Sequence, residues 1–386
     1  YGVQVNSLGL TEPQPENNVY RILIEALAVT LSKRARCRAL QLPAWNEAMG
    51  LPRPWDQQWS LRLQQILAYE TDLLEFEDLF DGSHVIEGKT NELAEKARKE
   101  LAKIDDMGGA VDAVEYMKAQ LVESQRQRVA GIESGDHMVV GVNAYKETEE
   151  SPLSAGEKSI QKVDPLLEAE TVAKLKAWRS ARESKAADSA LEDLRSAAVE
   201  GRNMMEPSIA AAKAGVTTGE WGGVLREVFD QYRGPTGVSL VLSADPESKE
   251  AEIKAEVERV SEILGRTLTY VLGKPGLDGH SNGAEQIASK AREVGMNVRY
   301  DGIRFTPEEI VRQAVEEKAH VVGLSILSGS HVDLVRDVAA RMREAGIGHI
   351  PLVVGGIIPP EDELVLKQVG VTRVYTPKDY KLNEIM

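Results

Sequence analysis

Residues 278–283 read DGHSNG, a short loop that fits two different kinds of chemistry. Residues 279–283 fit the pattern G-x-S-x-G, in which a serine nucleophile stands on a tight turn between a strand and a helix. The spacing Asp278-x-His280 suits a metal ligand instead, because a metal-bound imidazole needs an acceptor for its second ring nitrogen. The flanking residues have to distinguish a Ser281 nucleophile from a His280 ligand.

The length of the loop disfavours the nucleophile. The preceding strand is expected to end near Gly273, so residues 274–278 separate it from the motif, whereas a nucleophile elbow joins strand and helix directly. A serine triad also needs an acid and then a histidine further along the chain. Two later histidines are His331 and His349, and the second lies at the start of a strand, at the wrong end of the sheet. Since G-x-S-x-G also arises often by chance, we do not expect a hydrolase.

Two further short motifs accompany the loop. Alone, the loop at 278–283 is best explained as an exposed, glycine-rich turn without chemistry. The motif SIL at 325–327 and the pair GG at 355–356 each end an apolar, β-branched run. Ligands of open parallel α/β sheets bind beyond the carboxyl ends of the strands. Three motifs at such ends therefore favour a ligand site.

Residues 266–386 have the pattern of a doubly wound α/β sheet. Short apolar runs rich in β-branched residues alternate with segments whose apolar residues recur at helical spacing. We therefore expect a flavodoxin-like sheet of five parallel strands with helices on its faces. The expected strands are TLTYVLG, NVRYDGI, HVVGLSIL, IPLVVGGI and RVYTP.

The preceding sequence divides into two regions. Residues 1–90 alternate apolar runs with amphipathic segments, and YGVQVNSL, CRALQLPA and DLLEFEDLF are expected to be strands of a parallel α/β sheet or barrel. Since three strands form neither, and the chain opens as though in mid-strand, we expect further sequence upstream in the natural protein. Residues 91–265 are mostly polar and helical, and Thr218 is expected to cap a helix there.

Charge and cysteine content disfavour several classes of partner. The net charge is −15 without a dense run of Lys and Arg, which argues against nucleic acid and anionic membranes as partners. The single cysteine, Cys37, excludes an internal disulfide and suits a reducing cytosol, so we expect a cytoplasmic protein. No apolar stretch approaches the ~20 residues that cross a bilayer.

The motifs DxHxxG, SxL and GG, in this order and spacing, resemble the signature of the cobalamin-binding domain of mutases and methionine synthase. The segments NSLGLTEPQPENNVYRILIEALA, AWNEAMGLP, DDMGGAVDAVE and GVTTGEWGGVLREVF resemble parts of the methylmalonyl-CoA mutase family of acyl-CoA mutases. This resemblance covers essentially the whole sequence. It implies the C-terminal part of a substrate- and adenosine-binding (β/α)8 barrel at 1–90, a helical linker region at 91–265 and a cobalamin-binding domain at 266–386.

The resemblance also implies adenosylcobalamin as cofactor and a radical rearrangement of an acyl-CoA substrate. His280 is the implied lower axial ligand of the cobalt, and Asp278 and Lys274 form its relay. Glycines are expected to leave room for the buried nucleotide tail of the cofactor. The implied cofactor-binding residues of the C-terminal region are Lys274, Asp278, Gly279, His280, Ser281, Gly283, Ile287, Gly323, Ser325, Leu327, Gly355, Gly356, Tyr375 and Thr376.

The N-terminal region resembles the family at four further positions. Gln4 matches a glutamine that contacts the cofactor, and Glu47 matches a glutamate that binds the adenosine ribose. Tyr1 and Gly2 fall where the family contacts CoA. The residues that steer the rearrangement belong to earlier barrel strands, which this sequence does not contain.

Some positions depart from methylmalonyl-CoA mutase. Leu8 and Pro43 replace a tryptophan and an asparagine, Arg38 and Pro43 stand where the family has partners of Glu47, and LPRPWDQQWSLR replaces LPTDFSARIAR. These forms resemble the branch of the family that interconverts ethylmalonyl-CoA and methylsuccinyl-CoA. Mutases of methylmalonyl-CoA or isobutyryl-CoA, and a non-catalytic cobalamin-binding module, are the alternatives. The family further implies a homodimer and a G-protein chaperone for cofactor loading.

Overall fold

The computed structural model forms two compact units. One unit joins Tyr1–Gln161 with Gly234–Met386, and the other is Lys162–Arg233. The structure describes all residues except 150, 152, 154–159, 162–163, 239–248 and 380.

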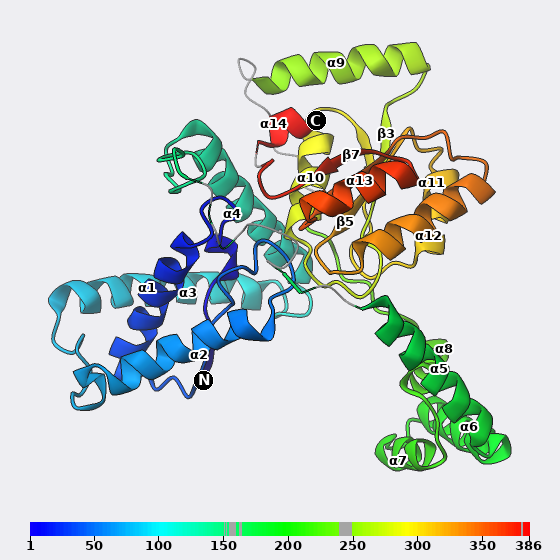
Figure 1. The fold of residues 1–386 in the computed structure, drawn as a ribbon, viewed down its shortest axis with the longest axis horizontal. Coiled ribbons are helices and arrows are strands. Elements are labelled where there is room, and N and C mark those ends of the chain that lie inside the picture. Colours follow the sequence, from blue (N-terminus) through cyan, green and yellow to red (C-terminus); the bar gives the residue numbers. More distant parts are fainter. Residues whose placement is uncertain (150, 152, 154–159, 162–163, 239–248, 380) are drawn as a thin grey trace. The chain divides into compact units, whose positions relative to one another are not determined.

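A five-stranded parallel sheet organises the C-terminal part of the first unit (Figure 1). Its strands are β3 (Thr269–Gly273), β4 (Asn297–Arg299), β5 (Val321–Ile326), β6 (Leu352–Gly356) and β7 (Val371–Tyr375). The order across the sheet is β4-β3-β5-β6-β7, with every neighbouring pair parallel. All five predicted strands are thus confirmed, in the doubly wound order of flavodoxin-like folds.

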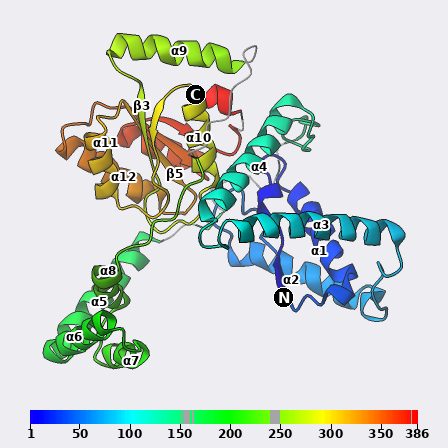
Figure 2. The same ribbon diagram turned by 180° about the vertical axis from the view of Figure 1, so that it is seen from behind.

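Helices follow the strands in turn and cover both faces of this sheet. They are α10 (Asn282–Glu293), α11 (Pro307–Glu316), α12 (His331–Glu344) and α13 (Pro360–Val369), and α14 (Leu382–Ile385) closes the chain. Figure 2 shows α11 and α12 side by side, and apolar residues of α11, α12 and α13 share one core with the sheet. Alanines of α10 belong to a second core on the other face.

Alternation along β5 separates the two faces of the sheet. Val322, Leu324 and Ile326 belong to the core beneath α11 to α13 and are at most 1% exposed. Because successive strand residues point to opposite faces, Gly323 and Ser325 lie on the α10 face. That face therefore carries small residues along the central strand.

The first unit also contains a smaller parallel β/α layer. It consists of β1 (Gly2–Gln4), α1 (Asn17–Leu31), β2 (Ala39–Gln41) and α2 (Pro54–Tyr69). The two strands pair in parallel, with Val3 opposite Leu40. Short 3-10 helices, Ser7–Gly9 and Lys33–Ala35, lie in the connections. Its small core contains Val5, Ile22, Ala26, Leu42 and Leu67.

The predicted strand DLLEFEDLF, residues 72–80, is wrong. The segment begins with a 3-10 helix, Asp72–Leu74, and continues in turns. The Thr71 hydroxyl accepts the backbone N–H of Leu73, and the Asp78 carboxylate accepts that of Phe80. Such local bonds from short polar side chains compete with the ladder of a sheet, so the apolar pattern alone misled the prediction.

Further helices complete the first unit. They are α3 (His84–Asp106), α4 (Val114–Ser134) and α9 (Lys249–Leu264). Helix α4 packs on α10 through a salt bridge of 2.6 Å between Lys118 and the buried Glu285. No helix in the described residues is both long and apolar enough to cross a membrane.

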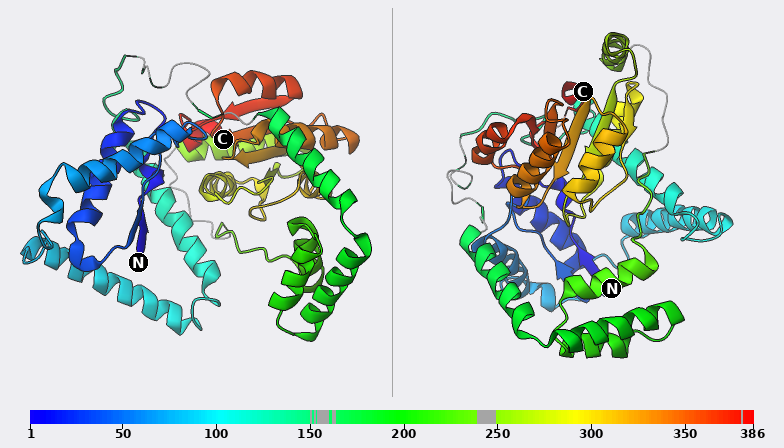
Figure 3. Two further views of the ribbon diagram at one scale, coloured as in Figure 1. Left: turned by 60° about the horizontal axis from the view of Figure 1, so that its bottom comes forward. Right: turned by 90° about the vertical axis from the view of Figure 1, so that its right-hand side faces the viewer.

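The second unit is helical throughout its regular structure. Its helices are α5 (Pro165–Ala181), α6 (Ser184–Glu200), α7 (Met205–Lys213) and α8 (Thr218–Phe229). Helix α6 packs against both α7 and α8 (Figure 3). The cap of α8 is Thr217 rather than the predicted Thr218, because Thr217 and Glu220 form a reciprocal capping box. The two neighbouring threonines made that start ambiguous by one residue.

Candidate functional site

A buried lysine begins the loop that follows β3. Lys274 is 0% exposed, and its Nζ lies 2.6 Å from Oδ2 of Asp278 and 3.3 Å from the Ser325 carbonyl oxygen. Reciprocal backbone contacts hold the loop, since Phe305 donates to Lys274 and Gly276 donates to Phe305. Burial lowers the pKa of Lys274, and the Asp278 carboxylate opposes that change. The lysine therefore ties this loop to the end of β5.

Asp278 is the centre of the hydrogen-bond network. Oδ2 accepts from Lys274 and from the backbone N–H of Leu327 at 2.8 Å. Oδ1 lies 2.8 Å from Nδ1 of His280 and accepts its backbone N–H at 3.0 Å. Burial opposes ionisation, but these bonds outweigh it and lower the pKa of Asp278 to about 2. The group is therefore a carboxylate at neutral pH, with both oxygens committed.

The imidazole of His280 is held on one side and open on the other. Its side chain is 74% exposed, while Nδ1 faces the Asp278 carboxylate. A carboxylate accepts, so in the neutral imidazole Nδ1 carries the proton and Nε2 keeps its lone pair. That arrangement orients an imidazole toward a metal and increases its basicity.

The serine next to this histidine lacks the partners of a nucleophile. Ser281 precedes α10 and makes no side-chain capping bond. The described residues show no hydrogen bond between Ser281 and a histidine; the Nδ1 of His280 faces Asp278 instead. A nucleophilic serine needs an adjacent base, which this arrangement does not provide.

The carboxyl ends of β5 and β6 form the wall beside this loop. Ser325 pairs in register with Gly355, and Ile326 with Gly356. A Cβ placed on Gly355 meets no described atom within 4 Å, so the face above it is open. A Cβ on Gly356 would lie 1.7 Å from the Ile326 carbonyl oxygen, and its φ is +156°. Gly355 thus leaves a space, whereas Gly356 is required by backbone packing.

The space beside the neighbouring glycine on β5, Gly323, is filled by a side chain. A Cβ on Gly323 would lie 2.0 Å from the hydroxyl oxygen of Tyr270 on β3. The phenol ring therefore fills the space above Gly323 in this structure. Of the predicted bare-backbone positions on the sheet, the open one is Gly355.

His280 and the open backbone at Gly355 have the features that a bound cobalamin requires. A protein histidine that replaces the lower ligand needs a free Nε2, a fixed Nδ1 proton and an exposed ring, and His280 has all three. A cofactor tail beside the sheet needs uncovered backbone, which Gly355 supplies. The residues present therefore fit this group, and on the same face of the sheet the Tyr270 ring covers Gly323.

The other predicted C-terminal residues surround the same edge with mixed burial. Gly279 and Gly283 are exposed, and Ile287 packs beside the core on the α10 face. Leu327 and Tyr375 are half-buried, and the Tyr375 hydroxyl donates to the Ile385 carbonyl at 3.4 Å. The final predicted position, at the end of β7, is Thr376, whose N–H bonds Asp379.

The predicted N-terminal residues lie on the smaller β/α layer. Tyr1, Gly2 and Gln4 are exposed, and Gln4 pairs in register with Gln41. Glu47 is half-buried in the turns between β2 and α2. Gln4 ends β1 and Glu47 follows β2, so both belong to the carboxyl edge of this layer.

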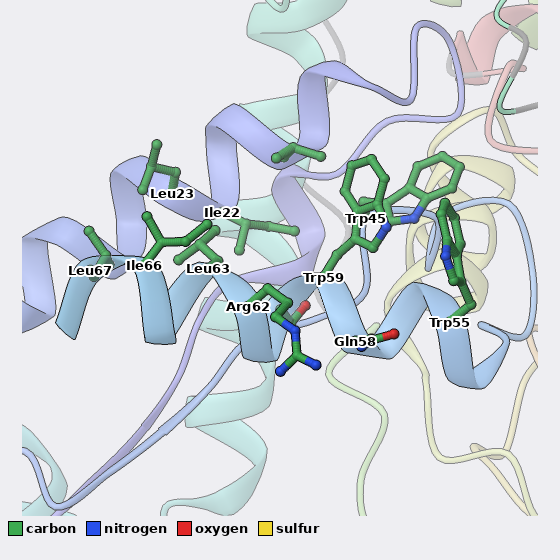
Figure 4. Close-up of a pocket in the computed structure, with 12 residues that line it drawn as sticks. Ile22, Leu23, Trp45, Trp55, Gln58, Trp59, Arg62, Leu63, Ile66 and Leu67 are labelled. Atoms are coloured by element: carbon green, nitrogen blue, oxygen red, sulfur yellow. The ribbon is translucent and has the colours of Figure 1, made fainter. Parts of the chain in front are cut away.

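A separate cavity of about 430 Å³ lies between α1 and α2 (Figure 4). Trp45, Trp55 and Trp59 line one end, and aliphatic side chains such as Ile22 and Leu63 line the other. None of the predicted site residues lines it. The cavity is therefore an apolar gap in the packing of the two helices and is distinct from the site at residues 274–283.

Comparisons with known proteins agree with this geometry. The sequence model described as methylmalonyl-CoA mutase matches residues 2–231, and that of the B12 binding domain matches residues 268–385. The chain belongs to the methylmalonyl-CoA mutase family. The B12 binding match contains the complete network around Asp278 and all five strands of the sheet.

The chain resembles two branches of this family to different degrees. It is 62% identical to ethylmalonyl-CoA mutase of Methylorubrum extorquens and 61% identical to that of Cereibacter sphaeroides, over 100% of this chain. It is 33% identical to methylmalonyl-CoA mutase of Escherichia coli over 99% of this chain. It spans 56%, 59% and 54% of these relatives, little more than half of their length.

The chain also aligns with a solved cobalamin-binding protein from Desulfitobacterium hafniense. The alignment covers 55% of this chain and 95% of that one, with a TM-score of 0.28 and 18% identity. A score this low does not establish a shared fold.

The structure joins Lys274, Asp278 and His280 in one hydrogen-bond network, as the sequence predicts, and adds partners that sequence reasoning missed. Leu327 was predicted only as a cofactor-binding residue, and the bond from its backbone N–H to Asp278 was not foreseen. The pair formed by His331 and Asp362, beyond the ends of β5 and β6, was also missed. Neither contact joins residues that are near in sequence. Only the adjacency of β3, β5 and β6 could have indicated them.

Proposed function

We propose that the protein is an adenosylcobalamin-dependent mutase that interconverts ethylmalonyl-CoA and methylsuccinyl-CoA. The observation that supports this most is the exposed imidazole of His280, fixed by Asp278 at the carboxyl edge of a B12 binding domain. The substrate is inferred from the higher identity to two ethylmalonyl-CoA mutases than to methylmalonyl-CoA mutase.

The proposed roles follow the geometry of the C-terminal site. His280 would bind the cobalt through Nε2, Asp278 would hold the imidazole proton, and Lys274 would keep that carboxylate charged. The uncovered backbone at Gly355 would accommodate the nucleotide tail beside Ser325. When bound, adenosylcobalamin supplies the radical that starts the rearrangement.

The N-terminal residues are proposed to contact the remaining ligands. Glu47 would accept hydrogen bonds from ribose hydroxyls, for which a carboxylate is well suited. Gln4 would contact the cofactor, and Tyr1 and Gly2 would contact CoA. We also propose a cytoplasmic homodimer that receives its cofactor from a G-protein chaperone. The dimer and the chaperone rest on the resemblance to the family, and the cytoplasmic location rests on the single cysteine, Cys37.

A cobalamin carrier without catalysis is the main alternative from another class. The mutase sequence model matches residues 2–231, most of the chain outside the B12 binding match, and a simple carrier has no need for that region. Among mutases, methylmalonyl-CoA is the rival substrate, and one methylene changes discrimination by only ~1–3 kcal/mol. Competition between both thioesters in the complete natural protein tests this choice, and we expect preference for ethylmalonyl-CoA.

Electron paramagnetic resonance of bound cob(II)alamin tests the cobalt ligand directly. With 15N-histidine in the protein, we expect the nitrogen splitting of the cobalt signal to change, and His280→Ala to abolish that change. His349→Ala, which removes an exposed histidine before β6 at the opposite end of the sheet, is the matched control and should retain it. An unchanged spectrum in His280→Ala would show that this imidazole is not the ligand.

A further inference from the structure

A second imidazole–carboxylate pair lies at the same edge of the five-stranded sheet. His331 is the first residue of α12 and is only 4% exposed. Its Nε2 lies 2.9 Å from Oδ2 of Asp362, in the first turn of α13, and its Nδ1 lies 3.4 Å from the Ser328 carbonyl oxygen. Both neighbours are acceptors, and a neutral imidazole has one N–H to donate, so the shorter contact, to Asp362, is its hydrogen bond. The ring therefore ties the loop after β5 to the helix that follows β6.

The loop held by this ring, residues 327–330, touches the proposed cobalt-ligand network. At its beginning, the backbone N–H of Leu327 donates to Oδ2 of Asp278 at 2.8 Å. The same carboxylate bonds Nδ1 of His280 through Oδ1. Any displacement of the loop would remove one of the four bonds that Asp278 accepts.

The same loop approaches the N-terminal layer. A Cβ on Gly329 would lie 2.6 Å from Cδ1 of Leu51, so the two segments are in close contact. Leu51 belongs to the connection between β2 and α2 that also carries Glu47. The loop 327–330 thus contacts both Asp278 and the connection that carries Glu47.

We propose that His331, together with Asp362, is a positioning residue for His280. The pair fixes the loop 327–330 so that the Leu327 N–H stays on Asp278 and Asp278 stays on the imidazole. This inference rests on the proposed function in that it takes His280 as the ligand. Outer-shell partners of metal-binding histidines commonly change metal affinity by about 10- to 100-fold when removed.

A control histidine, His320, distinguishes a positioning role of His331 from a merely structural one. His320 precedes β5 at the opposite end, where its Nδ1 accepts the backbone N–H of Thr269 at 2.9 Å. It joins β3 to β5 but does not touch the loop 327–330. Replacing either histidine removes a side-chain contact at an end of the same sheet, whereas only His331 is linked to Asp278 through the loop 327–330.

The experiment compares cobalamin binding in four variants of the whole chain. We expect His331→Leu to weaken cob(II)alamin binding about tenfold and to reduce the fraction of cobalt that shows protein-nitrogen splitting. His331→Gln keeps an N–H donor near the position of Nε2 and should restore both readouts. His320→Leu should leave both unchanged. Asp362→Ala breaks the same contact by changing its more exposed partner, and it should weaken binding as His331→Leu does. It therefore keeps the test valid if His331→Leu fails to fold.

The outcomes separate this inference from the proposed function. If His280→Ala retains the nitrogen splitting, the proposed ligand is wrong and the positioning role falls with it. If His280→Ala loses the splitting while His331→Leu and Asp362→Ala retain it at full affinity, only the positioning role is overturned. An equal loss in His320→Leu would likewise overturn it, because the effect would then be general destabilisation of the sheet.

Discussion

The two parallel sheets of the first unit differ in how completely they are enclosed. In the five-stranded sheet, β5 has neighbours on both edges, and Leu324 and Ile326 are at most 1% exposed. In the two-stranded sheet, β1 and β2 have three residues each, with only the middle residue partly buried. All-parallel sheets normally have both faces covered. Within the described residues, only the larger sheet meets that condition.

This difference separates the two halves of the proposed site. The network of Lys274, Asp278 and His280 is complete within the larger sheet and its loops. Gln4 and Glu47 belong to the smaller layer, whose helices keep large apolar side chains exposed. The most exposed of these on α1 and α2 are Tyr20, Ile24, Leu61 and Tyr69. Geometry therefore supports the cobalt-ligand residues more strongly than the adenosine residues.

The largest expected effect comes from breaking the buried ion pair of the larger sheet, compared with breaking an exposed pair on a helix outside both sheets. Lys274→Met leaves the Asp278 carboxylate buried without its cation, and we expect the free energy of unfolding to fall by ~3–5 kcal/mol. Lys96→Met removes a pair of 2.7 Å with Glu92 on the exposed surface of α3, which should cost less than ~0.5 kcal/mol. Denaturant unfolding of both variants measures the two values.

Equal small losses in the two variants would contradict this prediction. They would mean that the other donors to Asp278, from His280 and Leu327, compensate the carboxylate without the lysine. A double variant, Lys274→Met with Asp278→Asn, distinguishes that outcome. It should be more stable than Lys274→Met alone, because it removes the unpaired charge.

Two neighbouring glycines on β6 provide a finer test within the larger sheet. Gly356→Ala drives a Cβ against the Ile326 carbonyl, and we expect a loss of about 1–3 kcal/mol in thermal or denaturant unfolding. Gly355→Ala adds the same atom to open space and should change stability by less than ~0.5 kcal/mol. Weaker cobalamin binding by Gly355→Ala, at unchanged stability, is the result expected of a cofactor wall.

The pair of variants also tests the position of the cofactor tail. If Gly355→Ala binds cobalamin as the unmodified chain does, the tail does not pass over this residue. The remaining space beside the sheet would then have to come from movement of Tyr270 away from Gly323, which is the other glycine on that face.

Much of the larger sheet could be predicted because its local signals agree. Its strands are short β-branched runs, and the helix α11 begins with the capping box of Thr306 and Glu309. The Asp278 and His280 contact spans two residues, so the sequence pattern alone indicated it. The family resemblance added the cofactor that such a pair would serve.

The contacts that sequence reasoning missed depend on the packing of distant segments. Tyr270 reaches Gly323 because Leu272 and Gly323 are in register on adjacent strands. His331 meets Asp362 because consecutive helices start at the same edge. Neither register nor helix placement is set by local propensity. The error at residues 72–80 has a different cause. The apolar pattern there suits a strand, but the Asp78 carboxylate accepts the nearby backbone N–H of Phe80 and favours a turn.

The smallest expected effect is the pH dependence of stability, which compares the Asp278 carboxylate with that of Asp78. The pKa of Asp278 is lowered to about 2, so its stabilisation is present above the unfolded pKa of ~3.9 and is lost as the pH falls toward 2. The stability gap between the unmodified chain and Asp278→Asn should therefore narrow from pH 5.5 to pH 3.5. Denaturant midpoints at both pH values measure it.

Asp78 is the matched carboxylate of the smaller layer. The backbone N–H of Arg34 is the main cause that lowers its pKa, and it donates to the carboxylate at 2.8 Å. Because Asp78 lies near solvent, its charge interactions are screened. The stability difference between the unmodified chain and Asp78→Asn should therefore be smaller, and it should decrease less from pH 5.5 to pH 3.5. Equal narrowing in both variants would mean that the Asp278 network is as open to water as this turn. Asp278 would then not be an enclosed carboxylate that orients His280.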